Sequence, residues 1–200
     1  MPADRRHPGS CNYRANLGSG ADWYTTPPPP APDCFDPKNG NGAFQWMKPL
    51  YPQDFSDGLS NTVIYSERVV GDGNWTSYDP WRDYSQVGDA WPSCTAEQLT
   101  STCRTIAGIA DKHASFGGFT WLFASKAHTA YDHILPPNSL IPDCARDSHV
   151  EPSASNSAIA ARSQHRGGVN TVLGDGSVRF VSENVAIDVW RALGSRNGRD

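Results

Sequence analysis

The sequence lacks both a long hydrophobic run and an apolar N-terminal segment. No stretch approaches the ~18 consecutive apolar residues that a membrane-spanning helix needs. Residues 1–10 (MPADRRHPGS) are polar and do not contain the apolar centre of a signal peptide. The chain as written therefore has no export signal and no membrane span. Two interpretations follow: the protein is cytosolic, or its beginning is missing from the sequence.

A concentration of positive charge is also absent. The 17 Lys and Arg residues are scattered singly and are outnumbered by 21 Asp and Glu residues, which gives a formal net charge of −4. A nucleic-acid-binding domain normally gathers its Lys and Arg residues into a patch or stripe. We therefore expect no nucleic-acid partner.

None of the common catalytic motifs occurs. The sequence has no G-x-S-x-G nucleophile elbow, no H-E-x-x-H, no P-loop and no dinucleotide-binding glycine pattern. Glu67 lies in a β-prone run, but no second carboxylate stands at a defined partner position. We interpret Glu67 as a half-exposed strand residue paired with a base. We expect a protein that is not an enzyme and that holds no cofactor or metal.

Glycine and proline are present in excess. The 18 Gly and 16 Pro residues make up 17% of the 200 residues, against about 12% in average proteins. Seven Trp, seven Tyr and seven Phe residues nevertheless offer large side chains to bury. We expect one globular domain over residues 1–200, with a modest core and long, turn-rich loops.

The five cysteines, at positions 11, 34, 94, 103 and 144, form no C-x-x-C pair and fit no zinc-binding spacing. Many aromatic residues and long loops favour an oxidising compartment. A disulfide between Cys94 and Cys103 would close a short loop, and we expect that pair. The odd count leaves at least one thiol unpaired within this chain.

Three tryptophans stand out in the irregular middle of the chain, over residues 72–115. Trp75, Trp81 and Trp91 are candidates for an aromatic platform that binds a sugar or a peptide. Aromatic side chains also hold irregular loops in place by burying their surface, and this structural interpretation stays open beside the binding one.

Several short elements are predicted from local patterns. Residues 62–70 alternate within a β-prone run and predict a strand. Residues 95–103 predict one or two helical turns. Residues 119–123 and 130–135 predict two further short strands.

A hairpin is the clearest local prediction. Asp175-Gly176 lies between two β-prone arms, as in a type I′ turn with positive φ at both central residues. This turn would place Leu173 opposite Val178 and Thr171 opposite Phe180, with both pairs facing the core.

A short helix is predicted after the hairpin. Ser182 or Asn184 would cap it, and one face would carry Ala186, Val189, Trp190 and Leu193. The chain therefore ends as strand, turn, strand and helix, which predicts an α+β fold with an antiparallel sheet.

The segment HRGGVNTVLGDGSVRFVSENV places nine residues between His165 and Asp175-Gly176. This spacing resembles the H-x9-DG signature of a large bacterial family of pseudopilin-like proteins of unknown function, also labelled a solute-binding family. Further blocks resemble the family in the same order, so that the resemblance covers residues 11–200: NYRANLG at 12–18, DGLSNTVIYSE at 57–67, the Gly118/Trp121 block leading to LPPNS at 135–139, Cys144, and DVWRALGSRNG at 188–198.

The resemblance implies a pilin-like antiparallel β-sheet with long loop insertions, preceded in the family by a prepilin-type leader and a long apolar helix. Neither precedes the sheet here, and we expect a truncated start to explain this. The implied function is that of a non-enzymatic structural protein outside the inner membrane. Its partners would be subunits of a type II secretion or type IV pilus-like assembly. The alternative is an extracellular carbohydrate- or solute-binding module that uses the Trp-rich loops.

The signature residues are expected to have structural roles. His165 would hydrogen-bond backbone at the base of the hairpin, Gly167 and Gly168 would allow a bulge or a close strand approach, and Asn170 would satisfy a neighbouring loop. A catalytic pair of His165 and Asp175 is not expected, because a hairpin arm of ten residues separates them by roughly 20 Å or more. The spacing of His165 to His128 or His149 does not support a metal site.

Overall fold

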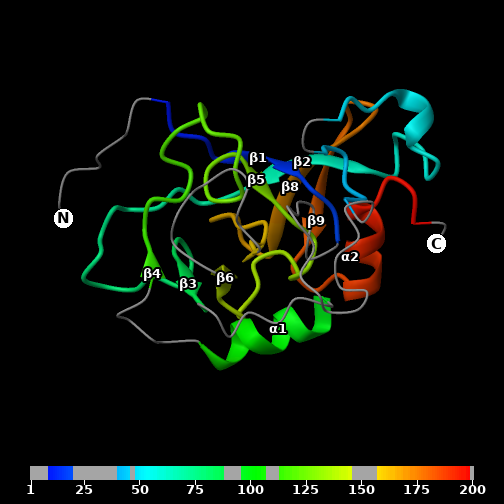
Figure 1. The fold of residues 1–200 in the computed structure, drawn as a ribbon. Coiled ribbons are helices and arrows are strands. Elements are labelled where there is room, and N and C mark those ends of the chain that lie inside the picture. The colour runs from blue at the N-terminus through cyan, green and yellow to red at the C-terminus, as the bar shows by residue number, and fades with distance from the viewer. Residues whose placement is uncertain are drawn as a thin grey trace, which may run out of the picture.

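The computed structural model describes residues 9–19, 40–45, 48–87, 96–106, 113–145 and 157–198. Two β-sheets and two α-helices make up this part of the chain (Figure 1). The predicted α+β class is confirmed, as is a C-terminal hairpin followed by a short helix. No helix within these ranges is long and apolar enough to cross a membrane.

The larger sheet has five strands in the order β5-β1-β2-β8-β9. They are β1 (Tyr13–Asn16), β2 (Val63–Glu67), β5 (Ala130–Tyr131), β8 (Gly168–Leu173) and β9 (Val178–Ser182). All neighbours are antiparallel except β1 and β5. The predicted strand over 62–70 therefore forms but is shorter, from Val63 to Glu67, and one further hydrogen bond in the same register joins the Arg68 N–H to the Asn12 carbonyl.

The smaller sheet has four strands in the order β4-β3-β6-β7. They are β3 (Tyr84–Gln86), β4 (His113–Ala114), β6 (Asp143–Ala145) and β7 (Ser157–Ala158). Strands β3 and β6 are parallel, so each sheet is mixed and not wholly antiparallel as predicted. The reason is connectivity: long crossovers, and not tight hairpins, bring β5 and β6 to their neighbours.

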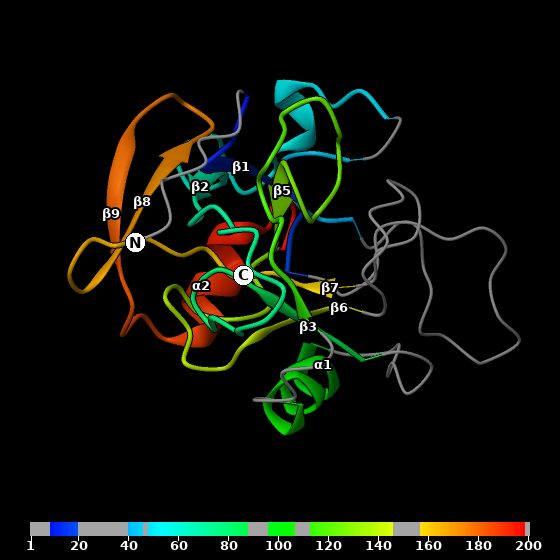
Figure 2. The same ribbon diagram turned by 90° about the vertical axis from the view of Figure 1, so that its left-hand side faces the viewer.

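The main hydrophobic core lies between the two sheets. Helix α2 (Ile187–Gly194) places Trp190 at its centre, fully buried against Val63 of β2 and Val169 of β8. The predicted helix is therefore present, but its N-cap is Ala186, without a side-chain hydrogen bond from Ser182 or Asn184. Val189, which we expected on the buried face, is about half exposed. In Figure 2 the β8–β9 hairpin stands at one side of the molecule.

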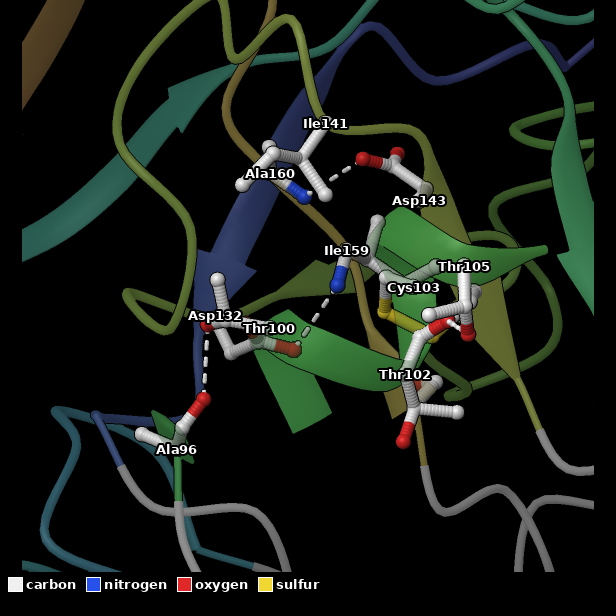
Figure 3. Close-up of a disulfide and its surroundings, with 12 residues drawn as sticks. Ala96, Thr100, Thr102, Cys103, Thr105, Asp132, Ile141, Asp143, Ile159 and Ala160 are labelled. Atoms are coloured by element: carbon white, nitrogen blue, oxygen red, sulfur yellow. Dashed lines mark hydrogen bonds between the residues drawn. A yellow bond between two sulfur atoms is a disulfide. The ribbon is translucent and has the colours of Figure 1, made fainter. Parts of the chain in front are cut away.

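Helix α1 (Ala96–Thr105), predicted over 95–103, covers the four-stranded sheet and lies outside the main core (Figure 1). Its two buried side chains are Leu99 and Cys103, and Cys103 forms a disulfide with Cys144 of β6 (Figure 3). The predicted Cys94–Cys103 pair is therefore wrong, and Cys94 itself lies outside the described residues. Proximity in sequence misled the prediction, because the helix turns Cys103 toward a strand 41 residues away.

The hairpin forms with a register shifted by one residue from the prediction. Val172 pairs with Val178, Asn170 with Phe180 and Val169 with Val181. Gly176 has a φ of +86° whereas Asp175 has no positive φ, so the turn is a three-residue loop with one left-handed glycine instead of type I′. Because one step of register reverses the faces, Val178 and Phe180 point away from the core.

The predicted strand over 119–123 does not form. These residues bend instead, and Trp121, Leu122 and Phe123 are exposed. The predicted strand over 130–135 is reduced to β5. A single-turn 3-10 helix, η2 (Pro52–Asp54), lies in the connection between β1 and β2.

Candidate functional site

Glu67, the last residue of β2, is the centre of a polar cluster at the base of the hairpin. Strands β2 and β8 are antiparallel neighbours, and their register sets Glu67 beside Asn170. The Asn170 backbone N–H donates to Glu67 Oε2 at 2.7 Å, and Asn170 Nδ2 donates to Oε1 at 3.2 Å. Glu67 is only 8% exposed, so these bonds stabilise a carboxylate that is largely removed from water.

Two further side chains donate to the same carboxylate. His165 Nε2 lies 3.1 Å from Glu67 Oε1, and the Tyr13 hydroxyl lies 3.1 Å from the same oxygen. Tyr13 reaches it because β1 pairs Tyr13 directly with Glu67. Partial desolvation, then the adjacent Glu67 charge, raises the pKa of Tyr13. Glu67 is thus the shared acceptor for two signature residues, His165 and Asn170.

This arrangement corrects the expected role of both residues. His165 was expected to bond backbone, and its ring instead binds a side-chain carboxylate while about half exposed. Glu67 was expected to be half exposed and paired with Arg68 or another base, and it is instead buried, with His165 as the base. No sequence signal placed these two residues together, because 98 positions separate them.

The chain segment before β8 is held by a second set of hydrogen bonds. Ser163 Oγ donates to the Gly168 carbonyl at 2.7 Å and accepts from the His165 N–H at 3.1 Å. Asn138, whose φ is +52°, accepts from the Ser163 N–H at 2.9 Å. These bonds fix the direction in which His165 leaves the backbone.

Gly167 and Gly168 each need to be glycine, for different reasons. Gly167 has a φ of +87°, which side chains with a Cβ rarely adopt. At Gly168 a Cβ would lie 2.1 Å from the Val181 carbonyl oxygen of the neighbouring strand. Gly168 therefore allows the close strand approach that the sequence suggested.

Asp175 at the hairpin tip has a purely local role. Its Oδ1 accepts from the Ser177 N–H at 2.9 Å and from the Ser177 hydroxyl at 2.7 Å. These bonds lower the pKa of Asp175. His165 and Asp175 thus have different partners, and the structure provides no acid–base dyad between them.

Two of the three tryptophans predicted as a platform lie within the described residues, and they have different partners. Trp75 is exposed and packs on Phe116 with ring centroids 5.4 Å apart. The guanidinium carbon of Arg162 lies 5.4 Å from the ring centroid of Trp81. Trp91 lies outside the described residues, so the platform stays a prediction. Arg162, the partner of Trp81, lines the cavity described next.

A cavity of about 400 Å³ opens beside Glu67. Charged side chains make up much of its wall: Glu67, Arg68, Arg82, Arg162 and His165, with Asn12, Val69, Val70, Ser163 and Gln164 between them. Its volume lies within the range of small-molecule sites, roughly 300–1,000 Å³. The sequence did not predict this cavity, because its lining comes from four separate segments.

Two of the arginines in the wall are buried and share one carboxylate. Arg68 Nη2 lies 2.6 Å from Asp143 Oδ2, and Arg162 Nη2 lies 2.8 Å from Asp143 Oδ1. All three side chains are about 1% exposed or less. Desolvation is the main cause that lowers the pKa of Arg68. These ion pairs were not predicted, since no periodic or motif signal in the sequence links the three positions.

A second buried ion pair, Lys126 with Asp132, lies 3.1 Å apart and ties β5 to the core. Desolvation raises the pKa of Asp132 despite this lysine. Arg14 is also buried, and desolvation followed by repulsion from Arg68 lowers its pKa to about 9. Within the described ranges, no three His, Cys, Asp or Glu side chains gather as metal ligands would.

A family model described as "Protein of unknown function (DUF1559)", with the short label SBP_bac_10, matches residues 6–188. The label denotes a solute-binding family. No curated protein and no solved structure matches the chain.

Proposed function

Because this chain belongs to the DUF1559 family of proteins of unknown function, and its sequence blocks resemble pseudopilin-like proteins, we propose that it is a non-enzymatic, pseudopilin-like surface protein. It acts outside the inner membrane as a structural subunit or accessory of a type II secretion or pilus-like assembly. In this proposal the protein contacts other subunits through its five-stranded sheet.

The outer face of that sheet is the observation that carries the proposal. Tyr13, Tyr65, Val178 and Phe180 lie on this face, and all four are more than a third exposed. They share it because the register pairs Tyr13 with Glu67, Tyr65 with Val172, and Val172 with Val178. Phe44 adds a ring 5.2 Å from that of Tyr65.

This sheet face, which exposes apolar side chains around the polar cluster of Glu67 and Asn170, is suited to packing against another element. Sheets in stable domains bury an apolar face against a second layer. The inner face of this sheet does so against Trp190 and the smaller sheet. Large exposed apolar patches rimmed by polar groups commonly mark interaction sites. The outer face therefore supports contact with a partner subunit.

The disulfide supports the proposed location. Cys103 and Cys144 are both fully buried and joined. Disulfides persist in oxidising compartments outside the cytoplasm and are rare within it. A protein displayed beyond the inner membrane fits this chemistry.

A photo-cross-linking residue at Phe180 in the native cell tests the proposal. Because Phe180 lies on the outer face, we expect adducts with subunits of a secretion or pilus-like assembly. The matched control carries the same photo-cross-linking residue in place of Trp121. That side chain is exposed, as Phe180 is, but it lies in the bent loop at 119–123. Equal adduct yields at the two positions, or no adduct with any such subunit, would overturn the proposal.

A second candidate function is extracellular solute binding, and the cavity beside Glu67 favours it. The family label points in the same direction. In this version the charged walls of the cavity, and not a shared tryptophan platform, provide the ligand contacts. Glycan binding that is lost in Trp75→Ala but retained in Trp81→Ala would instead restore a role for the exposed tryptophan.

A further inference from the structure

We propose that the cavity beside Glu67 and His165 binds a small carboxylate solute that also carries a hydrogen-bond donor, as an amino acid or a hydroxy acid does. This inference rests on the second candidate function, solute binding. It assigns the class of ligand from the charges of the cavity wall, which has a cationic end and an anionic end.

The cationic end is formed by Arg68, Arg162 and Arg82. Arg68 and Arg162 pair with Asp143, so the three buried groups carry two positive charges and one negative. Charges buried away from water interact strongly because little solvent screens them. An excess positive charge under the cavity wall therefore favours an anion in the cavity. Buried Arg14, which repels Arg68, adds positive charge, and buried Asp83, which attracts Arg68, offsets part of it.

The hydrogen bonds of Arg68 are made within the protein. Its Nη1 and Nη2 donate to the carbonyls of Trp81 and Arg82, and its Nε is buried from solvent. Arg68 therefore acts on a ligand through its charge. A carboxylate is the ligand group that guanidinium donors match best.

Arg82 is the adaptable member of the cationic end. Its side chain is 31% exposed and pairs with the similarly exposed Asp79 at 3.3 Å. Exposed ion pairs of this kind contribute at most about 1 kcal/mol. Arg82 Nη1 also donates to the Val70 carbonyl at 2.9 Å, which leaves Nη2 as the donor that faces a ligand most freely. Arg82 is therefore the residue that would contact the ligand carboxylate directly.

The anionic end is Glu67. Its Oε1 accepts from Tyr13, His165 and Asn170, whereas Oε2 accepts from the Asn170 N–H. A carboxylate offers about four lone-pair positions, which these four donors match. Glu67 therefore acts on the ligand through its negative charge, which attracts an ammonium group, or by exchanging one of these donors for a ligand hydroxyl. The same negative charge disfavours a dianion, which separates this site from a phosphate or sulfate site.

Val69 and Val70 add apolar surface to the cavity wall. A short aliphatic chain or an α-carbon fits against them without leaving polar groups unpaired. The volume of about 400 Å³ leaves ample room for a small amino acid or hydroxy acid.

Titration of the full chain by NMR and calorimetry, with L-alanine, L-serine, L-lactate, acetate and inorganic phosphate as probes, tests the inference. We expect saturable binding of the amino or hydroxy acids, weaker binding of acetate, and the weakest binding of phosphate. Arg82→Gln is expected to reduce affinity by about tenfold or more, equivalent to about 1.4 kcal/mol. Arg179→Gln, on the exposed hairpin strand, is the matched control and is expected to bind normally.

Two outcomes would overturn the inference. One is the absence of saturable binding of every probe up to about 10 mM, a concentration that detects even millimolar affinity. The other is equal affinity in Arg82→Gln and Arg179→Gln. Neither outcome depends on subunit assembly, so failure here leaves the cross-linking test of the sheet face unaffected. Glu67→Gln refines the result, because it should weaken amino acids more than acetate.

Discussion

The two sheets of this protein are held together in different ways. In the five-stranded sheet, β8 and β9 pair over five consecutive positions and are joined by a local turn. In the four-stranded sheet every strand has only two or three residues. Such short strands provide few ladder hydrogen bonds, and three of them are separated by long connections. Their stability has to come from elsewhere.

Side-chain links replace backbone pairing in the four-stranded sheet. Cys144 on β6 is joined to α1 by the disulfide (Figure 3). The neighbouring Asp143 forms ion pairs with Arg68 and Arg162. Asp143 also accepts from the Ala160 N–H at 3.2 Å. Two consecutive residues of β6, Asp143 and Cys144, therefore link the buried arginines and helix α1 to this sheet. The three predictions below test this contrast, from the largest effect to the smallest.

Asp143→Asn should cause the largest loss of stability. The change removes the only carboxylate that Arg68 and Arg162 share among the described residues, so two guanidinium groups stay buried with a neutral partner. Breaking a buried ion pair in this way costs about 3–5 kcal/mol. Chemical denaturation measures the free energy of unfolding. Asp79→Asn, which breaks the exposed pair with Arg82, is the control and should cost less than about 1 kcal/mol. Similar losses in the two variants would contradict the special role of Asp143.

The second prediction concerns pH and His133, which lies between the two sheets. His133 Nδ1 donates to the Trp190 carbonyl at 2.7 Å, which leaves Nε2 to accept from the Tyr131 hydroxyl at 2.8 Å. This ring is neutral, and burial lowers the pKa of His133 to about 3. The unfolded chain takes up this proton below pH 6.5, while the folded protein does not until about pH 3. Stability should therefore fall as the pH falls through that window.

The slope attributable to His133 is about 1.4 kcal/mol per pH unit well below pH 6.5. It is measured as the difference in unfolding free energy between pH 7 and pH 5, in the native chain and in His133→Gln. The variant should be less stable at pH 7 but should lose less on acidification. Carboxyl groups whose pKa is raised in the folded protein, such as Asp132, increase stability as the pH falls. This contribution is the same in the native chain and in His133→Gln, so it cancels in the comparison. Identical pH slopes would show that His133 does not contribute.

The smallest loss of stability is expected from a substitution in the turn of the hairpin. Gly176 has a φ of +86°, and a Cβ there would meet no atom within 4 Å. Gly176→Val therefore introduces backbone strain without a clash, which costs about 1–2 kcal/mol. Thermal unfolding measures the loss. Gly176→Asn should recover part of it, because Asn tolerates the left-handed conformation better. Equal melting of the native and Val chains would contradict this account of the turn.

Prediction from sequence succeeded where neighbouring residues decide the structure. The α1 helix, a strand within residues 62–70, the C-terminal hairpin and the α2 helix all follow from local periodicity and turn residues. The details that failed depend on distant parts of the chain. The hairpin register is one example, because the observed turn and the burial of Val169 and Val181 together select a pairing one residue away from the expected one.

The candidate site was predicted only in part. The signature drew attention to His165 and Asn170, yet neither composition nor spacing identified their shared partner Glu67, about a hundred residues earlier. The disulfide prediction failed for the same reason. It paired Cys103 with its nearest neighbour in sequence, whereas the structure pairs it with Cys144 across the fold. A hydrogen bond or disulfide between distant residues leaves no periodic trace in a single sequence.

The sequence by itself determined the class of the fold, its C-terminal hairpin and helix, and the family to which the chain is similar. These features depend on short-range physics: alternation of apolar residues, turn-forming glycines and motif spacing. Only the tertiary structure decided which face of the sheet is exposed, where the buried charges meet and which residues line the cavity. Those outcomes depend on how separate segments pack, since burial and desolvation act on side chains that meet in space regardless of their separation in sequence.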